Sequence, residues 1–132
     1  MRFTEQELTG AVEGAAKSVL AAQDKDVRKG RRTAEDAWAA LSRYQRYQML
    51  DGLGDQLLGV LVALPDIEVE VGTRPTFTDE QVAAAVRERA GEEMSGMRGK
   101  LLLKARVALV QLALSHVPPR VDPDALIVPD HG

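Results

Sequence analysis

Residues 100–116 read KLLLKARVALVQLALSH, and the expected fold follows from the pattern of this stretch. Most positions are apolar, while Lys100, Lys104, Gln111 and Ser115 recur at the spacing of one stripe along a helix. A helix that is apolar on nearly every other side is normally enclosed by protein. The stretch therefore predicts a central helix that other helices surround.

Residues 53–64 predict the second central helix. Leucines recur through this stretch at helical intervals, and Pro65 ends the pattern. The segment DGLGD at residues 51–55 overlaps its start and contains two glycines, which lower helix propensity. We expect a joint, or a close contact between helices, at these glycines.

Hydroxyl side chains mark the expected helix starts. Thr4, Thr33, Ser42 and Thr78 can each cap the free backbone amides of a first helical turn. An acidic residue or a glutamine follows each of them three positions later, which is the spacing of a capping box. The first helix is expected at residues 5–22, and the cap at Ser42 allows a kink or break near Leu41.

Two of these starts have similar sequences, FTEQEL at residues 3–8 and FTDEQV at residues 77–82. A duplicated helical hairpin would explain the likeness, and so would the independent use of one good capping solution. The likeness fades within about two helical turns, so independent use is the simpler explanation.

IEVEV at residues 67–71 is the one clean alternation of apolar and polar residues, which predicts an extended segment. It could pair with ALIV at residues 125–128, with the same segment of a second subunit, or with nothing. The simplest interpretation is an extended connection whose apolar side chains pack on a helix. Pro118 and Pro119 end the last helix and predict an extended tail.

These patterns together predict an all-α fold. We expect a single-domain bundle of four to five helices over residues 1–116, with a short extended segment at 67–71 and an extended Pro/Asp-rich tail at 117–132. A chain of 132 residues that is 45% apolar is long enough to bury one core of its own.

Composition narrows the classes of function. The chain has no cysteine, which excludes disulfides, thiolate zinc sites and cysteine nucleophiles, and favours a reducing cytoplasm. It shows neither a signal-peptide pattern nor a membrane span. A net charge of −3 disfavours general binding to phosphates. Abundant Ala, Val, Gly and Arg, with no Asn, is typical of a GC-rich bacterial genome, and we expect an actinobacterial source.

The sequence predicts no catalytic residue, cofactor or metal. His116 and His131 are the only histidines, and Ser115 cannot pair with His116 because neighbours on a helix point about 100° apart. Two carboxylate pairs at four-residue spacing could hold a cation, Asp51 with Asp55 and Glu88 with Glu92, but no calcium-loop pattern accompanies them. An enzyme is therefore not the favoured interpretation.

Two neighbouring segments predict a binding surface. DKDVRKGRR at residues 24–32 concentrates basic side chains, and RYQRYQML at 43–50 interleaves arginines with tyrosines. Such a mixture suits a protein interface or single-stranded nucleic acid. The predicted partner-binding residues are Arg28, Lys29, Arg31, Arg32, Arg43, Tyr44, Arg46 and Tyr47.

We therefore expect a small, non-catalytic helical interaction or regulatory protein that binds a macromolecular partner. The partner would be another protein or a second copy of the chain, as a homodimer, and no membrane is expected to take part. The alternative is a nucleic-acid-associated regulator that uses residues 25–32 with Arg43 and Arg46. It is less favoured because no recognition motif for nucleic acid is present.

Overall fold

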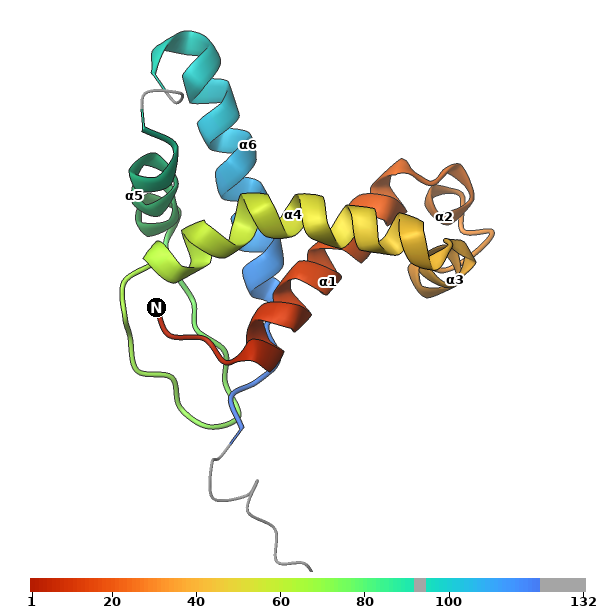
Figure 1. Cartoon of the computed structure of the whole chain (residues 1–132), viewed down its shortest axis with the longest axis horizontal. Coiled ribbons are helices and arrows are strands. Elements are labelled where there is room, and N and C mark those ends of the chain that lie inside the picture. Colours follow the sequence, from red (N-terminus) through yellow and green to blue (C-terminus); the bar gives the residue numbers. More distant parts are fainter. Residues whose placement is uncertain (92–94, 122–132) are drawn as a thin grey trace, which may run out of the picture.

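The computed structural model describes residues 1–91 and 95–121, which contain six helices and no strand (Figure 1). The helices are α1 Glu5–Gln23, α2 Lys25–Arg28, α3 Ala34–Ala40, α4 Arg43–Ala63, α5 Asp79–Ala90 and α6 Gly96–Ser115. The predicted all-α fold is confirmed. The structure has more helices than the four to five expected for two reasons. A four-residue helix forms within the basic stretch, and residues 34–63 form two helices, α3 and α4, rather than one.

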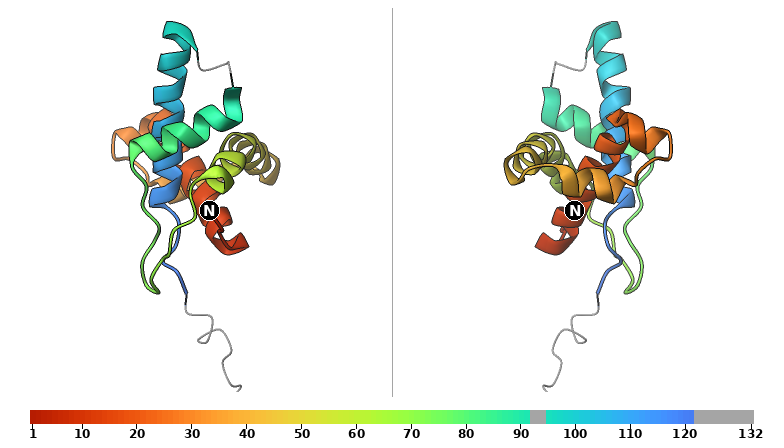
Figure 2. Two further views of the ribbon diagram at one scale, coloured as in Figure 1. Left: turned by 90° about the vertical axis from the view of Figure 1, so that its left-hand side faces the viewer. Right: turned by 90° about the vertical axis from the view of Figure 1, so that its right-hand side faces the viewer.

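The three longest helices, α1, α4 and α6, cross one another and form the framework of the bundle. α1 contacts α3, α4 and α6, and α5 packs against both α4 and α6 (Figures 1 and 2). The core lies where these helices cross, and its fully buried side chains include Leu57, Leu61, Val82, Val86 and Val110. Within the described ranges, no helix combines the length and the apolar character that crossing a membrane requires.

Capping boxes start α1, α4 and α5, as the sequence predicts. In each box a hydroxyl accepts from a backbone amide three residues later, and the side chain of that later residue accepts from the backbone amide of the cap. The pairs are Thr4 with Glu7, Ser42 with Gln45 and Thr78 with Gln81. The second box begins a new helix directly after Leu41, which confirms the predicted break there.

The expected joint at residues 51–55 is absent, since α4 runs without interruption from Arg43 to Ala63. Two glycines cost a helix about 1 kcal/mol each. Burial of Leu57, Val60 and Leu61 on the same helix outweighs that cost. The close contact between helices occurs instead at Gly59, where an added Cβ would lie 2.8 Å from Nε of Arg89 on α5.

The prediction that residues 101–114 are enclosed throughout is wrong for the first half of α6. Met97, Leu101 and Leu102 are 85%, 73% and 46% exposed, whereas Val110, Ala113 and Leu114 are buried. The helix joins the core cluster only from Leu103 onward. Its first turns project past the other helices (Figures 1 and 2), and most of their side chains are exposed.

The segment IEVEV is an extended connection between α4 and α5, and its apolar side chains Ile67 and Val69 pack against the core. The expected extended connection is thus confirmed, but of its two valines only Val69 packs as expected, since Val71 is 58% exposed. Two backbone hydrogen bonds tie the end of this connection to the C-terminal segment, from Gly72 N to Arg120 O (2.8 Å) and from Arg120 N to Thr73 O (2.7 Å). The predicted partner at residues 125–128 lies outside the described residues.

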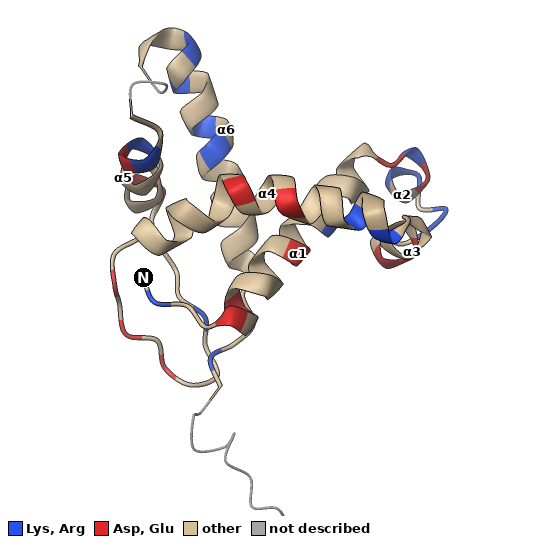
Figure 3. Cartoon of the chain, in the orientation of Figure 1, with Lys and Arg blue, Asp and Glu red and all other residues tan. Residues whose placement is uncertain are grey.

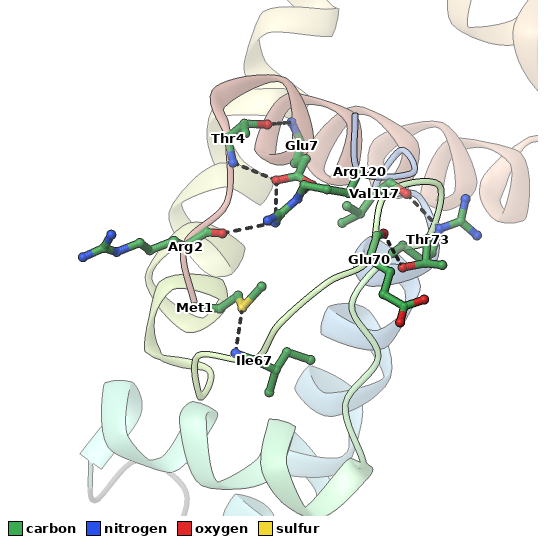
Figure 4. Close-up of polar contacts among 10 residues, drawn as sticks. Met1, Arg2, Thr4, Glu7, Ile67, Glu70, Thr73, Val117 and Arg120 are labelled. Atoms are coloured by element: carbon green, nitrogen blue, oxygen red, sulfur yellow. Dashed lines mark hydrogen bonds and ion pairs between the residues drawn. The ribbon is translucent and has the colours of Figure 1, made fainter. Parts of the chain in front are cut away.

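An ion pair holds residues 117–121 against the bundle (Figure 4). The guanidinium of Arg120 donates from Nε to Glu7 Oε2 (2.9 Å) and from Nη2 to Glu7 Oε1 (3.1 Å). Glu7 is the one charged residue buried in the described chain, and it also completes the capping box of α1. Val117 is buried beside this pair, so the chain after α6 begins as part of the packed structure.

The N-terminal residue is also part of the packing (Figure 4). The side chain of Met1 belongs to the core cluster, and its sulfur accepts from Ile67 N at 3.4 Å. The amino group of Met1 donates to Val62 O (2.9 Å) and to Leu64 O, two carbonyls at the end of α4. These bonds satisfy carbonyls that the helix itself leaves without a partner.

Candidate functional site

The predicted partner-binding residues come from α2, the turn after it and the first turns of α4. Figure 1 shows these segments at the same end of the molecule, together with α3. Arg28, Lys29, Arg31, Arg43, Tyr44 and Tyr47 are exposed, and Arg32 and Arg46 are half-buried. The structure thus brings the two predicted segments to one end of the molecule, where most of their side chains are exposed and two are half-buried.

The basic stretch is partly neutralised by its own acids. Arg32 forms an ion pair with Asp24, whose carboxylate also caps α2 by accepting from Val27 N at 3.0 Å. The guanidinium of Arg32 lowers the pKa of Asp24, and Asp24 in turn raises the pKa of Arg32. Nη1 of Arg31 lies 3.8 Å from Oδ1 of Asp26. A phosphate would have to compete with these carboxylates for two of the basic side chains.

The start of α4 exposes its aromatic side chains. Tyr44 and Tyr47 are 68% and 63% exposed, and their three-residue separation places them side by side on the helix surface. The hydroxyl of Tyr44 accepts from Gln48 Nε2 at 3.1 Å. Trp38, on the neighbouring α3, is by contrast buried. The simplest interpretation of the sequence, in which Trp38, Tyr44 and Tyr47 lie in the core or at its edge, is correct for Trp38 and wrong for the two tyrosines.

Farther along α4, an apolar groove lies between this helix and α1. Its volume is about 320 Å³. The apolar side chains in its lining are Leu8, Val12, Leu50 and Leu58, and its charged lining residues are Glu5 and Glu13. Leu58 is itself exposed. The sequence pattern did not reveal this groove, because it depends on the angle at which α1 and α4 cross.

The structure also pairs a serine with a histidine that lie 98 positions apart. Ser18 Oγ on α1 is 3.0 Å from Nε2 of His116, the residue that ends α6. The histidine ring lies directly on Gly14, where an added Cβ would be 2.2 Å from His116 Cγ. Gly10 and Gly14, four residues apart on α1, were the sequence signal for such a close approach.

This serine and histidine link α1 to the C-terminal end of α6. Ser18 lies inside α1, where backbone amides are already bonded within the helix. The position therefore lacks the free amides that stabilise an oxyanion in acyl transfer. Nearby, Lys17 bridges Glu13 of its own helix (3.3 Å) and Glu35 of α3 (3.1 Å), and its hydrogen bond to Glu35 raises its pKa.

The carboxylate pairs considered as cation sites are not brought to further ligands. Asp51 and Asp55 are exposed on α4, and Glu92 lies outside the described residues. Across residues 1–91 and 95–121, no three His, Asp or Glu side chains gather as a cation site would require. The strongest feature of the described surface is therefore its exposed aromatic, arginine and leucine side chains. Comparisons with known protein families, with curated proteins and with solved structures found no match for this chain.

Proposed function

We propose that this protein acts by binding another protein through the first turns of α4. The observation that carries the proposal is the exposure of Tyr44 and Tyr47 side by side, 68% and 63% open to solvent. Aromatic and arginine side chains supply most of the binding energy in protein interfaces. The buried Trp38 shows that this end of the bundle can enclose an aromatic ring. The exposure of Tyr44 and Tyr47 therefore supports a role for them in binding a partner.

The arginines beside the tyrosines define the chemistry of the partner. Arg43 is exposed and Arg46 is half-buried, and both lie in the same two turns as Tyr44 and Tyr47. Arginine binds carboxylates through two parallel hydrogen bonds, which gives an interface its orientation. We infer that the partner surface has an apolar centre with carboxylates around it. The lack of cysteine favours the cytoplasm as the place of this contact.

Nucleic acid is the weaker candidate for this end of the molecule. Arg31 and Arg32 lie within ion-pair distance of Asp26 and Asp24, although Arg31 is also exposed, whereas Lys25, Arg28 and Lys29 are exposed cations for which the described residues show no such pair. A phosphate-binding surface predicts an affinity that falls steeply as salt rises. Protein binding centred on tyrosines predicts a much smaller dependence on salt.

The test is a comparison of captured proteins between the wild-type chain and Y44A/Y47A. Each is immobilised in equal amount, exposed to extract of the source organism, and the bound proteins are quantified by mass spectrometry. We expect at least one protein to be depleted about tenfold or more with the double variant, because hot-spot residues contribute about 2 kcal/mol or more each.

The matched control is Val71→Ser, which removes a side chain of similar exposure from the connection between α4 and α5. It should capture the same proteins as the wild type. Identical captured sets for wild type and Y44A/Y47A would contradict the proposal. Captured nucleic acid that is released by salt and by K25E/K29E would favour the alternative instead.

A further inference from the structure

The first half of α6 carries an apolar stripe that the molecule itself does not cover. We call residues 96–105 the α6 tip. Met97, Leu101, Ala105 and Ala108 follow one another at intervals of three or four residues, so they share one side of the helix. All four are exposed, and Leu102 next to them is 46% exposed. Such a stripe is normally covered by another surface.

The charged residues that α6 itself places beside this stripe all have one sign, and Asp79 and Glu80 of α5 line one hollow together with Lys100 and Lys104. From Gly96 to Ala108 the charged residues are Arg98, Lys100, Lys104 and Arg106, and no acidic residue interrupts them. Figure 3 shows α6 marked only in blue. A covering surface that offers apolar side chains together with negative charge would therefore complement the tip.

The groove between α1 and α4 has that complementary character. Leu8, Val12, Leu50 and Leu58 line it, and its charged lining residues, Glu5 and Glu13, are both acidic, although Glu13 is also ion-paired with Lys17 of its own helix. Asp51 is exposed on α4 and adds negative charge to that helix, whereas Asp55 lines a separate hollow with Arg89 and Arg106. Figure 3 shows red segments on α1 and on the middle of α4.

The tip and the groove of one molecule do not meet. The tip projects away from α1 and α4 (Figures 1 and 2), and α6 joins the core only from Leu103 onward. Any contact between these two surfaces must consequently join two molecules. We propose that the α6 tip of one molecule docks into the α1–α4 groove of a second copy of this chain.

A second copy explains both surfaces at once. An anionic membrane would also attract a basic, apolar helix face, but it would leave the acidic groove without a role. A contact made by half a helix buries a small area, so the association is weak and depends on concentration. The proposal uses residues other than Tyr44 and Tyr47, so it stands or falls independently of the proposed function.

A charge exchange between tip and groove tests the proposal. Variant K100E/K104E makes the tip acidic, and variant E5K/E13K makes the groove basic. Within either variant alone, tip and groove carry like charges and repel. In a mixture, the acidic tip of the first variant fits the basic groove of the second, and the unchanged tip and groove form the original contact. Sedimentation equilibrium from about 5 to about 500 µM, where small interfaces dissociate, measures the mass.

For the wild type we expect the average mass to rise above the 14.3 kDa of one chain as concentration increases. Each variant alone should associate about tenfold more weakly or not at all, because like charges face each other across the contact. The equimolar mixture should recover the association of the wild type. Variant K25E/K29E, which changes exposed lysines of the basic stretch, should associate as the wild type does. Circular dichroism establishes that every variant is folded.

Three results would overturn the proposal. A wild type that stays at the mass of one chain over the whole range excludes the contact. An E5K/E13K variant that associates as strongly as the wild type excludes the groove as the docking site. Folded variants that remain monomeric when mixed exclude the pairing of tip with groove. A monomeric wild type that binds vesicles of anionic lipid, and loses that binding as K100E/K104E, would assign the tip to a membrane instead.

Discussion

In the second half of α6, Val110, Ala113 and Leu114 are buried among the other helices, whereas in the first half Met97 and Leu101 face solvent. The two halves belong to one continuous helix and carry three leucines each, although leucine, valine and alanine together number four in the first half and seven in the second. They differ in their neighbours, since the core cluster reaches α6 only from Leu103 onward. The comparison teaches that an apolar composition sets how much surface a helix has to bury, while neighbouring helices set where along it that surface is buried.

The largest expected effect is a difference in the free energy of unfolding between variants in the two halves of α6. Leu114→Ala leaves a cavity in the core and should lower the free energy of unfolding by about 2 to 5 kcal/mol. Leu101→Ala removes the same atoms from a side chain that is 73% exposed, and should change it by less than about 0.5 kcal/mol. Urea unfolding of dilute protein measures both. Equal losses would mean that the first half is packed as closely as the second.

A second prediction concerns the ion pair that anchors the chain after α6. Arg120→Ala removes the partner of the buried Glu7 carboxylate and should cost about 2 to 3 kcal/mol, a value reduced because Arg120 is itself partly exposed. Arg98→Ala, on the exposed first half, serves as the matched control and should be nearly neutral. A neutral Arg120→Ala, again measured by urea unfolding, would show that this segment does not hold the bundle together.

A third prediction compares a glycine that another residue approaches closely, Gly14, with a glycine that has open space around it, Gly52. Gly14→Ala places a Cβ within 2.2 Å of the His116 ring and should destabilise the protein by about 1 to 3 kcal/mol. Gly52→Ala meets nothing within 4 Å and should stabilise it by about 0.5 to 1 kcal/mol. Thermal unfolding of the two variants should therefore shift in opposite directions. Adding His116→Ala to Gly14→Ala should recover part of the loss, and no recovery would contradict the contact.

The smallest effect is a dependence on pH at the opposite end of the molecule. Because Arg32 lowers the pKa of Asp24 in the folded state, the pair stabilises the fold above the ordinary aspartate pKa of about 3.9. That contribution is lost as pH falls through the lowered pKa. Asp24→Asn keeps a capping side chain but removes the charge, so the difference in unfolding midpoint from wild type should be present at neutral pH and vanish well below pH ~3.9. A difference that persists in acid would contradict the ion pair.

The features that could be predicted from the sequence are local ones. Capping boxes at Thr4, Ser42 and Thr78 depend on residues three positions apart, and each forms as expected. The continuity of α4 through Gly52 and Gly54 could not be predicted, because burial of Leu57, Val60 and Leu61 on the same helix outweighs the local propensity. The pair of Ser18 with His116 joins residues 98 positions apart, and the spacing of Gly10 and Gly14 indicates a close approach to α1 without indicating which residue makes it.

The candidate surfaces show the same division. The segment at residues 43–50 was found from its arginines and tyrosines alone, but the exposure of Tyr44 and Tyr47 and the burial of Trp38 required the packing of α3. The groove between α1 and α4, and the exposure of the α6 tip, depend on crossing angles and on how far each neighbour extends. Periodicity along a single helix contains neither quantity.

Thiol labelling in dilute solution tests the difference between the halves of α6 most directly, because the chain has no cysteine to interfere. Single variants Leu101→Cys and Leu114→Cys are reacted with a thiol reagent at a concentration where one chain stands alone. We predict that Leu101→Cys reacts at nearly the rate of a free thiol, and that Leu114→Cys reacts about a thousandfold more slowly, since its thiol is reached only through unfolding. Equal protection of the two thiols would contradict the account.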